Sequence, residues 1–139
     1  FLRGVYAAAR LGLAFGAREM QVTVDGTTHP SRVTLCEAAN TYRIAQAVPI
    51  APEADIADGL LDIVILSDLK RHELRPYLRA LRAQMHLGLP KVTLLRGREI
   101  RFEAARACNV HADDQIIGVT PVTITVAPNA LKVLVDPRL

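Results

Sequence analysis

Acidic residues crowd a glycine turn in the stretch APEADIADGLLDI, residues 51–63. Carboxylates and backbone carbonyls that converge on a tight turn supply the oxygen ligands that a hard cation such as Mg²⁺ prefers. The Asp58-Gly59 pair also fits an ordinary turn, in which the aspartate side chain accepts a hydrogen bond from its own backbone. The residue types by themselves favour the ordinary turn, and both interpretations stay open at this point.

Other sequence signals of chemistry are absent or scattered. The two phosphate-binding glycine patterns, GxxxxGK[ST] and GxGxxG, do not occur in the sequence. No serine lies in a GxSxG pattern. The histidines show no HExxH or other paired metal spacing; they are His29, His72, His86 and His111. The chain therefore carries no recognisable phosphate cradle or zinc motif.

Arginines recur at helical spacing further along, at Arg75, Arg79 and Arg82. At about 100° per residue this stripe borders an apolar helix face that we expect to be buried; that face contains Leu78, Leu81 and Met85. A helix with arginines beside an apolar edge can contact anionic lipid. A solvated helix face accounts for the same pattern.

The composition indicates one folded domain. The chain has 139 residues, of which 50% are hydrophobic and 22% charged, which is enough apolar surface for a core. The net charge of +3 is compatible with an anionic ligand or a membrane surface. Nucleic acid is disfavoured, because no basic stretch is interleaved with aromatic residues. Cys36 and Cys108 lack CxxC spacing and are expected to be free thiols in a reducing compartment.

The elements that must position these residues are mostly strands. We predict an initial helix over residues 1–17, too short and too charged to span a membrane, and two helical pieces, 69–75 and 76–86. Alternating or continuous apolar residues predict the strands Met20–Val24, Arg32–Ala39, Leu61–Leu66, Lys91–Leu95, Glu99–Ala104, Cys108–Ala112, Val122–Val126 and Leu131–Val135. Asp25-Gly26 predicts a turn after the first strand. Leu61–Leu66 is expected to be a central strand, because little alternation survives in it. The predicted fold class is α+β, mainly antiparallel β: a β-sandwich with a helical insertion.

Three patches occur in a distinctive order: Asn40 in AANTYR, then IAPEADIADGLLDIVIL, then HADDQ followed by TPVTITVAPNALKVLV. Together they resemble the C-terminal half of the diacylglycerol kinase-like lipid kinases, over most of residues 38–137. The resemblance implies that residues 1–139 form a single C-terminal β-sandwich domain. It also implies that the N-terminal nucleotide-binding domain, which would bind most of the ATP, is absent from this chain.

The resemblance implies particular site residues. Asp55, Asp58 and the carbonyl of Leu60 would hold Mg²⁺, and Asn40 would contact the substrate. The family's catalytic D-G-E triplet matches Asp113, Asp114 and Gln115, so an amide replaces the carboxylate base. An amide cannot accept the proton at neutral pH, although it can orient a hydroxyl; Asp114 could substitute if the turn is shifted by one residue. A second departure is Ala-Gln-Ala at residues 45–47, where the family has glycines.

The function implied for the intact protein is transfer of the ATP γ-phosphate to a lipid hydroxyl of the diacylglycerol type, with the isolated chain inactive. The alternative is a non-catalytic lipid-binding or regulatory module on the same fold, and a third possibility is an NAD kinase-like protein. The expected partners are a lipid substrate, a transient membrane surface and, through an exposed strand edge, a second copy in a homodimer. The expected location is cytoplasmic and peripheral to the membrane.

Overall fold

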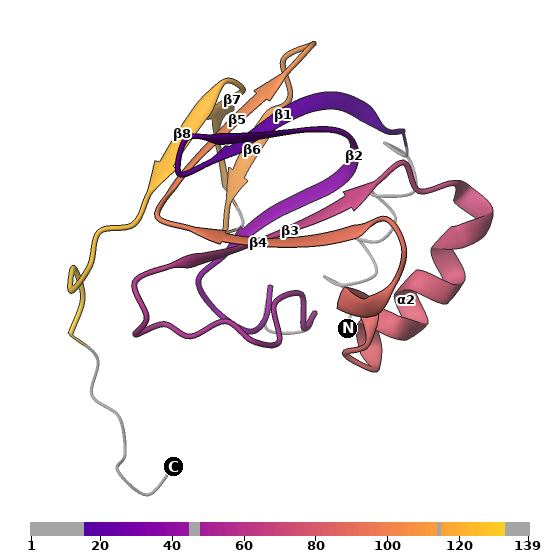
Figure 1. Ribbon diagram of the computed structural model, residues 1–139, viewed down its shortest axis with the longest axis horizontal. Helices are drawn as coiled ribbons and strands as arrows, with labels where there is room; N and C mark the ends of the chain where they lie inside the picture. Colours follow the sequence, from indigo (N-terminus) through magenta and orange to yellow (C-terminus); the bar gives the residue numbers. More distant parts are fainter. Residues whose placement is uncertain (1–15, 45–47, 114, 133–139) are drawn as a thin grey trace, which may run out of the picture.

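The computed structural model describes residues 16–44, 48–113 and 115–132 (Figure 1). Its strands are β1 (Arg18–Val24), β2 (Thr27–Ala39), β3 (Leu61–Ser67), β4 (Val92–Gly97), β5 (Glu99–Ala104), β6 (Asn109–Ala112), β7 (Gln115–Val119) and β8 (Val122–Thr125). Between β3 and β4 lie a 3-10 turn η1 (Arg71–Glu73), the helix α2 (Leu74–Arg82) and a second 3-10 turn η2 (His86–Gly88). The predicted class, mainly antiparallel β with a helical insertion, is confirmed.

All strand pairs are antiparallel, and six strands form one sheet in the order β4-β3-β2-β1-β5-β8, with β6 and β7 forming a separate hairpin. The β1–β2 connection is the predicted Asp25-Gly26 turn, in which φ is 45° and 82°. Positive φ at both residues matches the twist of the paired strands, which is the geometry favoured in two-residue hairpins. β2 is longer than predicted, since it begins at Thr27 rather than Arg32.

The sheet must curl, because β4 and β5 are four positions apart in it while only Arg98 separates them in sequence. Four strand spacings in a flat sheet are about 19 Å, whereas two residues of extended chain span about 7 Å. Figure 1 shows the chain passing from β4 to β5 through a tight corner. There the Asp25 N–H donates to the carbonyl of Glu99 at 2.9 Å, and the Asp25 carboxylate accepts the Arg98 N–H at 3.0 Å.

The curled sheet encloses the main core, and a second core lies on its outer face over β3. Val22, Ile63, Ile65 and Ile100 are almost completely buried inside the curl. The outer core is formed by Val64 of β3 with Ala39, Ile50 and Ala51, and is covered in part by α2 and η2. Both faces of β3 are therefore buried, which explains its unbroken apolar sequence and confirms its predicted central position.

The helical insertion differs from the two pieces predicted. Pro76 lies inside the first turn of α2, where its missing N–H is tolerated, and the helix ends at Arg82 instead of continuing to His86. Gln84 adopts φ 60°, while the Met85 N–H donates to the Ala80 carbonyl at 2.8 Å. This is the hydrogen bonding of a Schellman termination, with glutamine in the position usually taken by glycine.

That termination overturns the predicted burial of the Leu78, Leu81 and Met85 face. Leu81 packs on the outer core, but Leu78 is 38% exposed and Met85 is 71% exposed. Met85 follows the left-handed residue Gln84 and no longer continues the helical period, so its side chain lies outside the helix face. The expected apolar face is correct only for Leu81.

The C-terminal region contains one strand that was not predicted, β7, which pairs with β6. A strand is expected over residues 131–135, but Leu131 and Lys132 lie outside any strand. The rest of that segment falls outside the described residues. Nearly all of the helix expected over residues 1–17 also falls outside them. Cys36 and Cys108 are free, as expected. Among the described residues, no helix has the length and apolar character to cross a membrane.

Candidate functional site

The end of β2 and the beginning of β3 bring two of the sequence patches together. Ala39, the last residue of β2, pairs with Asp62 in β3. Asn40 follows Ala39 and is exposed, while Leu60 immediately precedes β3. Because antiparallel strands place these positions at the same end of the sheet, the Asn40 segment and the acidic turn of residues 55–60 are neighbours.

The acidic turn is built by the aspartates' own hydrogen bonds. Asp55 Oδ1 accepts the Ala57 N–H and Asp58 Oδ1 accepts the Leu60 N–H, both at 2.8 Å. Gly59 follows with φ 71°, which a residue with a Cβ rarely adopts. The backbone geometry is therefore that of the ordinary turn expected for Asp58-Gly59. The Asx turns of Asp55 and Asp58 each use only Oδ1 of the carboxylate.

The donor set at this turn suits a hard cation only in part. Asp55 and Asp58 are both exposed and supply oxygen ligands. Within the described ranges, however, no three Asp, Glu, His or Cys side chains are grouped closely enough to hold a metal ion. A Mg²⁺ bound here would need the Leu60 carbonyl and water to complete its coordination. The side chains present therefore supply only part of a Mg²⁺ site.

An arginine anchors the acidic segment to the sheet. Arg96 in β4 lies opposite Asp62 in β3, and its Nε donates to Asp62 Oδ1 at 2.7 Å. Its Nη2 donates to the carbonyl oxygen of Glu53 at 3.1 Å. The hydrogen bond to Asp62 holds the pKa of Arg96 above its usual range. Asp62 is almost completely buried, so its carboxylate has a structural role. The sequence alone did not show which carboxylates of the acidic stretch are structural and which could bind a ligand.

The third patch is the β6–β7 hairpin. Ala112 pairs with Gln115, and Asp113 lies in the turn that follows Ala112. Asp113 has φ 52° and is exposed, as is Gln115. Asp114 lies outside the described residues, as does the Ala-Gln-Ala segment at residues 45–47.

Glu37 in β2 is a functional candidate that the sequence analysis missed. It lies three residues before Asn40 and pairs with Val64 in the centre of the sheet. Burial, and after it the negative charge of Asp113, raises the pKa of Glu37 to about 7. The charge of Asp113, in the hairpin turn, therefore acts on a residue of β2. A carboxyl group with this pKa can exchange a proton near neutral pH.

The only sequence signal for Glu37 is a charged residue inside an otherwise apolar strand, LCEAA. Burial also raises the pKa of the adjacent Cys36 thiol to about 12, so this cysteine is a protonated thiol at neutral pH. The arginine stripe of α2 does not join the site. The acidic turn precedes β3 and α2 follows it, so the two segments begin at opposite ends of this strand.

Replacing Glu37 by glutamine is expected to make the stability of the domain less dependent on pH. Because burial raises the folded-state pKa of Glu37 to about 7 from its ordinary value of 4.5, its contribution to stability is fully present below the lower value and is lost as pH rises through the higher one. At about pH 8 the variant should be more stable by on the order of 2 kcal/mol, with little difference at about pH 5.

Urea unfolding at several pH values measures this effect. Glu99→Gln, which removes the same charge from an exposed position at the start of β5, is the matched control for the loss of one negative charge. Parallel stability curves for Glu37→Gln and the unmodified chain would show that the carboxyl group does not titrate in this range.

Comparison with known proteins identifies the class. Residues 2–135 match the family model of the YegS C-terminal NAD kinase beta sandwich-like domain. The chain therefore belongs to this family, the C-terminal domains of diacylglycerol kinase-like proteins. The expected family resemblance is confirmed.

Two curated relatives are the diacylglycerol kinases of Mycobacterium tuberculosis strains CDC 1551 / Oshkosh and ATCC 25618 / H37Rv, each 30% identical over 115 residues. The match covers 82% of this chain and 37% of each relative, so the chain spans well under half of their length.

Solved structures from Bacillus anthracis str. Sterne have the same fold. A candidate diacylglycerol kinase superposes with a TM-score of 0.74 at 15% identity, covering 88% of this chain and 43% of that one. A second diacylglycerol kinase structure has a TM-score of 0.68 at 16% identity, covering 91% of this chain and 47% of that one. At these identities the similarity concerns the fold alone.

Proposed function

We propose that this chain is the C-terminal domain of a lipid kinase that, in the intact protein, transfers the γ-phosphate of ATP to a hydroxyl group of a diacylglycerol-like lipid. The observation that carries the proposal is the position of the Asn40 segment beside the acidic turn, at one end of β2 and β3. The diacylglycerol kinase names of the relatives support the choice of substrate class.

Phosphoryl transfer depends mainly on positioning and charge neutralisation. In the proposed site Asn40 contacts the lipid, and Gln115 orients the acceptor hydroxyl by hydrogen bonds. Asp114 accepts the hydroxyl proton. Asp55, Asp58 and the Leu60 carbonyl would hold Mg²⁺, which when bound stabilises this turn and supplies positive charge near the transferred group. The ATP would be bound mainly by a nucleotide-binding domain outside this chain.

A second candidate function rests on Gln115. The glutamine stands where the related kinases are expected to have a carboxylate base, so the protein would bind a lipid without phosphorylating it. This candidate predicts that lipid remains bound to the purified protein while no phosphate is transferred from ATP.

Phosphate transfer from labelled ATP to diacylglycerol and to a mixed lipid extract tests the proposal in the intact protein that contains this chain. We expect transfer by the unmodified protein and also by its Gln115→Glu variant, since the proposed base, Asp114, is present in both. Activity in the variant alone would favour the lipid-binding candidate. No transfer by either protein would contradict the kinase assignment.

A further inference from the structure

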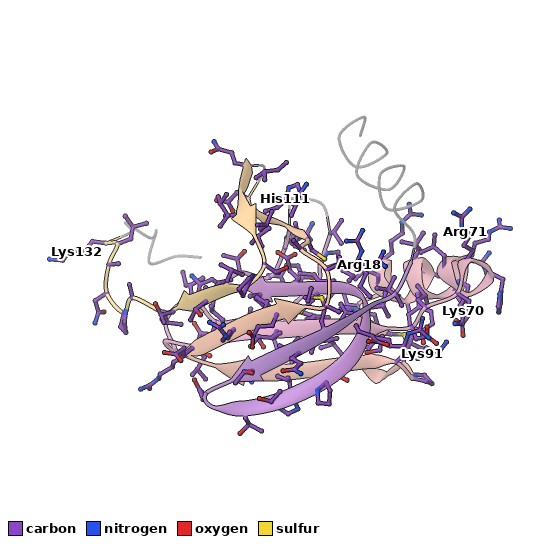
Figure 2. The ribbon with its side chains drawn as sticks, turned by 90° about the horizontal axis from the view of Figure 1, so that it is seen from above. Arg18, Lys70, Arg71, Lys91, His111 and Lys132 are labelled. Carbon is purple, nitrogen blue, oxygen red and sulfur yellow. The ribbon has the colours of Figure 1, made fainter. Side chains whose placement is uncertain are left out.

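The outward face of the helical insertion carries a concentration of positive charge. Arg71 in η1 is followed at helical intervals by Arg75, Arg79 and Arg82 in α2, and all four are exposed. We call these four residues the arginine face. Figure 1 shows α2 at the periphery of the molecule, and Figure 2 shows the Arg71 side chain pointing away from the sheet.

The arginine face has no acidic partners in the part of the chain that the structure describes. The ion pairs found there involve other cations, namely Arg32, Lys70, Lys91, Arg96 and Arg101. Glu73, the acidic residue nearest to the helix start, is bonded to Lys91 at 2.7 Å. Within residues 16–44, 48–113 and 115–132, these four positive charges are thus exposed and have no acidic partner.

This arrangement opposes the stability of the helix. Arg71 and Arg75 lie at the N-terminal end, where the helix dipole disfavours cations, and the first turn of α2 has no acidic residue. The spacing of four residues from Arg71 to Arg75 and again to Arg79 places like charges next to each other on one face. An anionic surface would relieve both repulsions.

The shape and apolar residues of the face suit a lipid surface. His72, Arg75, Pro76 and Arg79 line an open hollow of about 450 Å³. Leu78, 38% exposed, lies among the arginines, and Met85, 71% exposed, follows the end of the helix. Exposed apolar side chains flanked by arginines can enter the boundary between headgroups and acyl chains, while the guanidinium groups contact the headgroups.

We propose that the arginine face, with Leu78 and Met85, docks the protein on a bilayer that contains anionic lipids. The negative surface of such a bilayer complements the charge of the arginine face, and the exposed apolar residues lie beside these charges. The helix lies on the surface and does not enter it as a span, because α2 has only nine residues. The proposal does not depend on kinase activity, so it can fail or succeed independently of the proposed function.

Co-sedimentation of the full chain with vesicles tests the proposal. The vesicles are pure phosphatidylcholine or phosphatidylcholine with about 30 mol% phosphatidylglycerol. We expect binding only to the anionic vesicles, with loss of binding at high salt. The double variant Arg75→Gln/Arg79→Gln should bind about 30-fold more weakly, since each basic residue near an anionic bilayer contributes roughly a factor of five.

The matched control is Arg98→Gln/Lys132→Gln, which removes the same charge from two exposed positions away from α2; Figure 2 shows Lys132 at the opposite end of the molecule from Arg71. It should bind nearly as well as the unmodified chain. Equal loss in both double variants would show that net charge alone matters and would overturn the proposal. Binding to neutral vesicles, or to heparin without binding to any vesicle, would also overturn it. Unchanged circular dichroism confirms that each variant is folded.

Discussion

Replacing Arg96 by methionine is expected to destabilise the domain clearly, because the Asp62 carboxylate would remain buried without its partner. The Asp62 side chain is 2% exposed and receives its hydrogen bond from Arg96 Nε at 2.7 Å. The acidic segment would also lose its anchor, since the same guanidinium group contacts the Glu53 carbonyl.

Urea unfolding of three variants measures this effect. Arg96→Met/Asp62→Asn should recover most of the lost stability, because the buried group is then neutral. Arg101→Met removes an arginine from a pair with Glu103 in which both side chains are more than 40% exposed, and should change stability little. Equal effects of Arg96→Met and Arg101→Met would contradict the importance of burial.

Gly97→Ala is expected to destabilise the domain by about 3 kcal/mol, as overpacking does at a rigid contact. Gly97 is the last residue of β4 and is buried at the corner where the sheet curls. A Cβ at this position would overlap Val24 Cγ1 and lie 2.8 Å from Asp25 Oδ2. Asp25 cannot move away easily, because its carboxylate accepts the backbone N–H groups of Arg98 and Glu99.

Gly118→Ala in β7 is the matched control, since a Cβ there meets no atom within 4 Å. It should leave the thermal midpoint almost unchanged, whereas Gly97→Ala should lower it by several degrees. Combining Gly97→Ala with Val24→Ala should cost less than the sum of the two single changes, because the shorter side chain removes the overlap. Additive effects would indicate that the corner does not close through this contact.

The sequence predicted those features that depend on neighbouring residues. The alternation of apolar and polar residues in Glu99–Ala104 predicted β5 with the bounds that the structure shows, and the Asp25-Gly26 pair predicted the turn of the first hairpin. The apolar run of β3 indicated a strand buried on both faces. The order of the three patches indicated the family, which the match over residues 2–135 confirms. The individual roles of Asn40, Asp55, Asp58, Leu60 and Gln115 stay predictions.

Contacts between distant residues determined the remaining features. Arg96 lies 34 positions from Asp62, and Glu37 acquires its pKa of about 7 from burial and from Asp113 on another hairpin. Met85 is exposed because Gln84 terminates the helix, although the apolar period continues in the sequence. Short-range patterns specify which residues form a strand or a turn, because those preferences act within a few residues. Burial, partner and charge environment depend on how the sheet closes, and that closure brings together residues whose separation in sequence carries no signal of their proximity.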